Sequence, residues 1–216
     1  SQKQLNEIAR RIEKMSFIRC ALNITENIKD AYNKGDKVHY PDEAGPVYVS
    51  DKIGRTRPEV LKPICFEDGR ISVCDYSAKP TADCLVFDPT KGDRIMKIFN
   101  RIGEAGVIAT YNITAENVAA KGSVSASDVQ LCDCDVAYFE YFSRECGVIR
   151  KGEKLDVMLE NNDQFKLYTL VPIKNGVAVF GRIDKYVSRG ALLSEKDGEL
   201  SLYEGGEIGI YSESPI

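Results

Sequence analysis

The sequence contains no tryptophan and only one histidine, His39, among its 216 residues. A single histidine argues against a mechanism built on a Ser–His or Cys–His pair. It also argues against a zinc site, because such sites usually draw on four well-spaced Cys and His ligands. We therefore expect neither a bound metal nor a cofactor.

Long apolar runs and strong net charge are also missing. No stretch of about 18 apolar residues occurs, so we expect no membrane-spanning helix. The net charge of −4 gives no basic field to attract nucleic acid or an anionic membrane. No secretory signal is recognisable, and we expect a cytoplasmic location. The first residue is Ser1, so a processed end and a cut from a longer protein are both open.

Seven cysteines are present, an odd number for a set of disulfides. We interpret them as reduced thiols, several of them filling strands as small apolar residues. Cys132 and Cys134 have a spacing that a metal site can use, but structural packing is the favoured reading.

The N-terminal quarter has a helical pattern followed by a polar loop. Apolar residues recur at three- and four-residue spacing over residues 3–34, which predicts an amphipathic helix. A loop over 36–46 leads to a short strand at 47–49. Residues 64–66 and 71–74 flank an Asp68–Gly69 turn, which predicts a hairpin.

Beyond residue 84 the pattern is one strand after another. The expected strands cover 94–100, 107–113, 136–142, 155–159 and 165–171. Asn175–Gly176 predicts a two-residue hairpin turn, and 200–203 with 207–211 predicts a last hairpin. Strands this close in sequence must mostly be antiparallel. We predict a mainly β protein, with an antiparallel β-sandwich over 61–216 and a helix-plus-strand segment over 1–60.

Carboxylates are abundant, but abundance alone does not make a catalytic pair. Most of the aspartates stand beside turns, where Asp commonly caps its own backbone. Asp51 differs because it follows a strand end, where a side chain can project into a cleft. Tyr48 and three other tyrosines offer flat faces for a sugar, although alternating aromatics normally fill a sandwich core.

Several segments resemble, in order, the raffinose synthase, seed imbibition protein and alkaline α-galactosidase group of glycoside hydrolases (family 36). They are AGPVYVSDKIG (44–54), LKPICFEDGRI (61–71), CDYSAKPTADCLVFDP (74–89), KIFN (97–100), GVIATYN (106–112), GSVSASDV (122–129), LYTLVPI (167–173) and FGRIDKYVSRGA (180–191). The resemblance covers roughly residues 44–192, and motifs that are collinear over that length are specific.

This resemblance implies a catalytic TIM barrel followed by an antiparallel β-domain, with residues 1–60 as a remnant of the barrel. It implies substrate-binding roles for Tyr48, Ser50, Asp51 and Asp83, and no catalytic residue in this chain, because the family's two carboxylate motifs lie upstream of GPVYVSD. Size supports the same view, since a (β/α)₈ barrel takes about 250 residues and only about 60 precede the β-rich part.

We therefore expect the C-terminal portion of a retaining galactosyl hydrolase or transferase, inactive alone, with galactoside sugars and the missing barrel domain as its partners. The alternative is a non-catalytic carbohydrate-binding or scaffold β-sandwich. A third and weaker hypothesis is another hydrolase with its own site on the sandwich.

Overall fold

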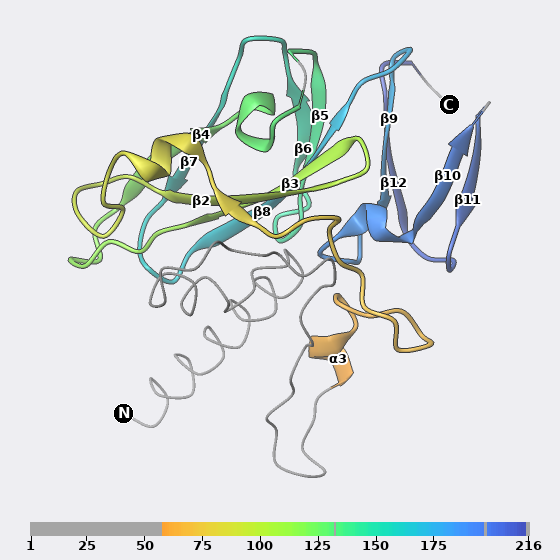
Figure 1. Ribbon diagram of the computed structural model, residues 1–216, viewed down its shortest axis with the longest axis horizontal. Coiled ribbons are helices and arrows are strands. Elements are labelled where there is room, and N and C mark those ends of the chain that lie inside the picture. Colours follow the sequence, from red (N-terminus) through yellow and green to blue (C-terminus); the bar gives the residue numbers. More distant parts are fainter. Residues whose placement is uncertain (1–57, 132, 197, 215–216) are drawn as a thin grey trace, which may run out of the picture.

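The structure is a computed structural model that describes residues 58–131, 133–196 and 198–214, and this part is mainly antiparallel β-structure (Figure 1). The strands are β1 (Lys79–Pro80), β2 (Met96–Ile102), β3 (Ala105–Tyr111), β4 (Ala120–Val124), β5 (Val136–Glu140), β6 (Cys146–Ile149), β7 (Leu155–Leu159), β8 (Phe165–Pro172), β9 (Val177–Arg182), β10 (Leu192–Lys196), β11 (Glu199–Leu202) and β12 (Ile208–Ser212). The short helices are α3 (Pro58–Leu61), η1 (Ala82–Leu85), η2 (Ala126–Val129) and η3 (Ser188–Ala191).

A six-stranded sheet in the order β1-β2-β3-β8-β5-β6 organises the described residues, and all its neighbours pair antiparallel. Strand β3 lies inside this sheet, and all seven of its residues are buried. Successive side chains of a strand point to opposite faces. Val107 and Ala109 accordingly join one apolar cluster, whereas Ile108 joins another. Strand β3 therefore needs cover on both faces.

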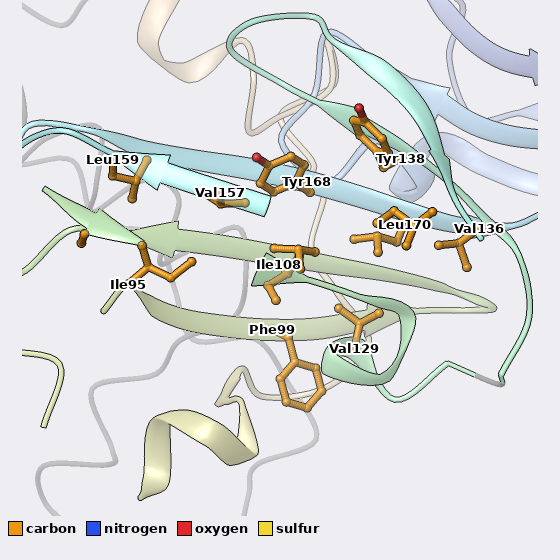
Figure 2. Packing of buried hydrophobic residues seen from close by; sticks show 13 residues of the cluster. Ile95, Phe99, Ile108, Val129, Val136, Tyr138, Val157, Leu159, Tyr168 and Leu170 are labelled. Carbon is orange, nitrogen blue, oxygen red and sulfur yellow. The ribbon is translucent and has the colours of Figure 1, made fainter. Parts of the chain in front are cut away.

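On one face of the sheet the cover comes from the β4–β7 pair and from η2. Val124 of β4, Val157 and Leu159 of β7 and Val129 of η2 belong to the same buried cluster as Ile108 (Figure 2). This arrangement is a two-layer packing in which the second layer is a separate two-stranded sheet.

The opposite face is covered by segments that are far apart in the sequence. Ile64, Cys74 and Ala78 come from the chain before β1, and Tyr186 and Val187 come from the segment between β9 and η3. The remaining pairs, β9–β12 and β10–β11, lie beside one end of the six-stranded sheet (Figure 1). The cluster that joins β9 to the sheet includes Phe139 and Phe180, whose ring centroids lie 5.8 Å apart.

The structure confirms the antiparallel β architecture and most of the expected strands. Strands β2 and β3 pair through a turn that contains Gly103, whose φ is +53°. The hairpin around Asp68–Gly69 also forms, although only as the isolated bridge between Cys65 and Ile71.

The Asn175–Gly176 turn is present, but it does not begin the hairpin ladder that we expected. Both residues have positive φ, 52° and 76°, and Lys174 and Val177 exchange two backbone hydrogen bonds. Strand β8 is already bonded to β3 on one edge and to β5 on the other. No edge is left for β9, which pairs with β12 instead.

The last expected hairpin, 200–203 with 207–211, is wrong in its pairing. Strand β11 pairs with β10, and β12 pairs with β9. Alternation in the sequence predicts that a strand forms, but it does not name the partner, which depends on which sheet edges are still free.

The helix expected at 3–34, the strand at 47–49 and the barrel remnant lie outside the described residues, so they stay predictions, as does the boundary at residue 60. The described cysteines form no disulfide. Cys132 is outside the described ranges, so the reading of the Cys132–Cys134 pair stays a prediction.

The close contact between β3 and η2 predicts that Gly106→Ala destabilises the fold. A Cβ at Gly106 would lie 2.4 Å from the Cβ of the fully buried Val129. We expect a loss of about 1–3 kcal/mol in the free energy of unfolding, measured by urea denaturation. Gly205→Ala is the control, because no atom beyond its two chain neighbours lies within 4 Å of its Cβ position. An equal loss in both variants would contradict this packing.

Candidate functional site

Of the four residues predicted to bind substrate, the structure describes one. Tyr48, Ser50 and Asp51 lie outside the described residues, and their roles stay predictions. Asp83 lies in η1, and its side chain is 51% exposed. The candidate site is therefore built around Asp83.

Lys97 of β2 is the centre of the interactions at Asp83. Its side chain is only 4% exposed. The ammonium Nζ lies 3.0 Å from Asp83 Oδ2 and 2.8 Å from Asp128 Oδ1, and it donates to the Ser123 carbonyl oxygen at 3.0 Å. A lysine ammonium has three donors, so this set of three acceptors uses all of them.

The two carboxylates are also held from their other side. Asp128 Oδ2 accepts hydrogen bonds from the backbone N–H of Ser125 at 2.8 Å and from its hydroxyl at 2.9 Å. This is the reciprocal capping arrangement at the start of η2. Asp83 Oδ1 accepts a 2.6 Å hydrogen bond from the Thr81 hydroxyl. Both carboxylates are thus positioned before any ligand arrives.

The electrostatics keep Asp83 and Lys97 charged. Burial acts to raise the pKa of Asp83, but hydrogen bonds from Thr81 and Lys97 together outweigh it, so the pKa lies below its usual value. Burial acts to lower the pKa of Lys97, but hydrogen bonds from Asp128 and Asp83 outweigh it, so this pKa is raised. Neither group is poised to exchange a proton near neutral pH, which makes binding or positioning a better role than acid–base catalysis.

A surface hollow of about 370 Å³ opens next to this ion cluster. It gathers residues from η1, β2, β4, η2 and the turn before β7, which are far apart in the sequence. Its lining consists of Ala82, Asp83, Lys97, Phe99, Ser123, Ser125, Ser127, Asp128, Gln130 and Lys154. Serine, carboxylate, amide and ammonium groups beside one aromatic ring can form hydrogen bonds to a polar ligand and pack against its apolar face.

The sequence analysis named Asp83 as a site residue, and that role stays a prediction. It did not name Lys97 or Asp128. A signal for Lys97 exists, because Ile95, Lys97 and Phe99 alternate and share one face of the chain. A lysine on a buried face requires oppositely charged partners. The sequence does not show which of its many aspartates supply them.

A second hollow, of about 400 Å³, contains Arg70, Asp75 and Arg189, but its charged groups are occupied by the protein itself. Arg189 donates to the Val179 carbonyl oxygen at 2.6 Å, and Asp75 accepts from the Gly103 N–H at 2.6 Å. The Arg70 guanidinium lies 4.3 Å from the centre of the Tyr203 ring. Its charged groups are therefore less open to a ligand than those beside Lys97.

Membrane-spanning helices and metal-binding clusters are both absent from the described ranges. None of the helices there has the length and apolar character needed to cross a membrane. In the same ranges, no group of three or more His, Cys, Asp or Glu side chains is arranged to hold a metal ion.

Comparison with known proteins gives a family match for part of the chain. Residues 43–122 match the family model described as raffinose synthase or seed imbibition protein Sip1. A pea protein named galactinol–sucrose galactosyltransferase is 30% identical over 212 residues, which cover 80% of this chain and 26% of the relative. An Arabidopsis thaliana protein named probable galactinol–sucrose galactosyltransferase 6 is 39% identical over 179 residues, covering 68% of this chain and 24% of the relative. The chain thus spans about a quarter of the length of these relatives.

Among solved structures, a GH27 β-L-arabinopyranosidase of Geobacillus stearothermophilus covers 45% of this chain and 20% of its own length. Its sequence identity is 18% and its TM-score is 0.34. A likeness of that size carries no argument about this chain.

The ion cluster predicts that Lys97→Met is strongly destabilising. The substitution leaves the Asp83 and Asp128 carboxylates close together without a cation. We expect a loss of about 2–4 kcal/mol in the free energy of unfolding, below the range for fully buried pairs because Asp83 is half exposed. Adding Asp128→Asn to Lys97→Met should recover part of the loss.

Lys121→Met is the matched control for this experiment, because Lys121 is an exposed lysine of β4 outside the hollow. We expect its stability to stay within about 0.5 kcal/mol of the parent. A Lys97→Met protein as stable as this control would contradict a stabilising role for the contacts of Lys97 with Asp83 and Asp128.

The lowered pKa of Asp83 predicts a stability contribution that depends on pH. A carboxyl whose folded-state pKa is lowered stabilises the fold above its unfolded value, about 3.9, and that contribution is lost as pH falls towards the folded value. The stability gap between the parent and Asp83→Asn should therefore be constant above about pH 5 and shrink below about pH 3.9. Urea denaturation at a series of pH values measures the gap, with exposed Asp156→Asn as the control for removing one charge. A gap that does not narrow in acid would count against the interaction.

Proposed function

Because the chain matches the raffinose synthase group over part of its length, we propose that it is the C-terminal portion of a retaining galactosyl hydrolase or transferase, inactive by itself. The substrates of the intact protein are raffinose-type or other α-galactosides. The alignment with the pea galactosyltransferase carries this proposal, because it runs over most of this chain but only a quarter of the relative.

The contacts of the described residues support the proposal that this chain is inactive by itself. A retaining glycosidase needs two carboxyl groups facing each other across the sugar, one as nucleophile and one as acid and base. Asp83 and Asp128 both contact Lys97 Nζ, which lies between them and donates to each. With the ammonium between them, the two groups do not face each other across an open space, and the lowered pKa of Asp83 makes this residue unsuited to act as an acid.

In the intact protein the reaction takes place in two displacements. One carboxylate attacks the anomeric carbon and forms a galactosyl-enzyme, and water or an acceptor sugar then takes the galactose. We propose that residues 1–60 are a remnant of the barrel that provides these groups, with Tyr48, Ser50 and Asp51 near the sugar, and that the protein is cytoplasmic. The missing part of the barrel is the proposed partner of this chain.

Exposed apolar side chains next to the candidate site support such a partner. Leu85 and Val86 follow Asp83 directly and are 73% and 82% exposed. Burying these two side chains against another domain would be favourable, by about 25 cal/mol for each Å² of apolar surface removed from water.

A non-catalytic carbohydrate-binding or scaffold domain is the second candidate function. The hollow beside Lys97 favours it, because a lining of polar side chains together with the buried Phe99 is suited to binding a sugar without transforming it.

The proposal predicts that the two lengths of the protein differ in activity. The 216-residue chain should release galactose from an aryl α-galactoside no faster than buffer without protein does. The protein encoded by the complete reading frame should release or transfer galactose. Heat-unfolded chain is the blank for both assays. Turnover by the 216-residue chain would overturn the claim of inactivity, and an intact protein that acts on no α-galactoside would overturn the enzyme class.

A further inference from the structure

We propose that the hollow beside Lys97 binds a neutral pyranoside through adjacent hydroxyl groups, with Lys154 and Gln130 as rim donors and Asp83 as acceptor. The choice of a galactoside among sugars rests on the proposed function. The binding site itself rests on the geometry of the hollow.

The charges of the lining select a neutral ligand. Two carboxylates, Asp83 and Asp128, are balanced by two ammonium groups, Lys97 and Lys154. An anion would meet the carboxylates, and a metal cation would need the position between them that Lys97 Nζ already occupies. A neutral ligand is not repelled by the carboxylates and does not need the position of Lys97 Nζ.

The hydrogen-bonding groups of the lining match those of a sugar. A carboxylate has about four acceptor positions, and Asp83 uses one for Thr81 and one for Lys97. Its half-exposed side chain therefore retains acceptor capacity. Within the described residues, the side chains of Lys154 and Gln130 have no hydrogen bond or ion pair. Because a sugar hydroxyl both donates and accepts, adjacent hydroxyls can satisfy the carboxylate and a rim donor together.

Gln130 is held in an uncommon backbone conformation at the edge of the hollow. Its φ is +54° at the end of η2, in the left-handed region. Its N–H donates to the Ser127 carbonyl oxygen at 3.1 Å, and its own carbonyl accepts from Arg101 Nη1 at 3.0 Å. Such conformations persist where the surroundings enforce them and often mark binding sites. Here the conformation fixes the position from which the amide side chain extends.

Preorganisation and size fit a single sugar ring. Lys97, Thr81 and Ser125 immobilise the two carboxylates, so these two side chains lose little entropy on binding. The volume of about 370 Å³ lies near the lower end of ligand pockets, and Phe99 lines the hollow as its aromatic component.

The test is a titration of the isotopically labelled 216-residue chain with methyl α-D-galactopyranoside, followed by NMR amide shifts. We expect saturable shifts confined to residues 82–83, 97–99, 123–130 and 154. Lys154→Ala and Gln130→Ala should each weaken binding about tenfold, since each removes a hydrogen bond worth about 1.5 kcal/mol. Lys121→Ala, an exposed lysine outside the hollow, should bind like the parent.

Three results would overturn the site: no saturable shift, shifts that cluster elsewhere in the chain, or equal affinity in all three variants. Inorganic phosphate or calcium shifting the same amides more strongly than the sugar would refute the charge argument. Activity of the intact protein is measured separately. Binding by the chain without turnover by the intact protein refutes the proposed function alone, whereas turnover without binding at the hollow refutes this site alone.

Discussion

A buried ammonium must be surrounded by acceptors, and Lys97 meets this requirement by drawing three separate segments together. Its partners come from η1, from β4 and from η2, which follow one another over residues 82–129. The same contacts hold the second layer against the sheet at β2, and they shape the hollow beside it. Removing a charge from water costs several kcal/mol unless partners compensate it, so this cluster constrains the arrangement of the segments around it.

The position of β3 explains why the pairing departs from sequence order. Because β3 is fully buried, its backbone N–H and C=O groups need a partner strand on each edge. Its side chains need an apolar layer above and below the sheet. Strand β8 supplies the second edge, although 53 residues separate the end of β3 from its start. Once β8 is bonded to β3 and β5, the chain after Asn175–Gly176 must leave the sheet. Strands β9 to β12 then form their own pairs.

The described part combines a buried apolar core with a polar hollow beside Lys97. Both aspartates at the hollow contact the same lysine, and, against the effect of burial, the hydrogen bonds of Asp83 with Thr81 and Lys97 lower its pKa, which keeps it a charged acceptor. Relatives that carry a galactosyltransferase name extend over about four times the length that this chain covers. The galactosyl chemistry proposed for the intact protein and the sugar binding proposed for this β-rich part are therefore separable, and each has its own measurement.

Local sequence alone indicated many of the strands, their antiparallel direction and the tight turns, but not β4, β6 or β10. Alternation of side chains and turn residues such as Asn175–Gly176 are short-range signals that need no knowledge of the rest of the chain. The tertiary structure alone decided which strands pair and which carboxylates reach Lys97. Both outcomes depend on contacts between distant segments, and a sheet edge or an ammonium donor that one segment occupies is no longer open to another.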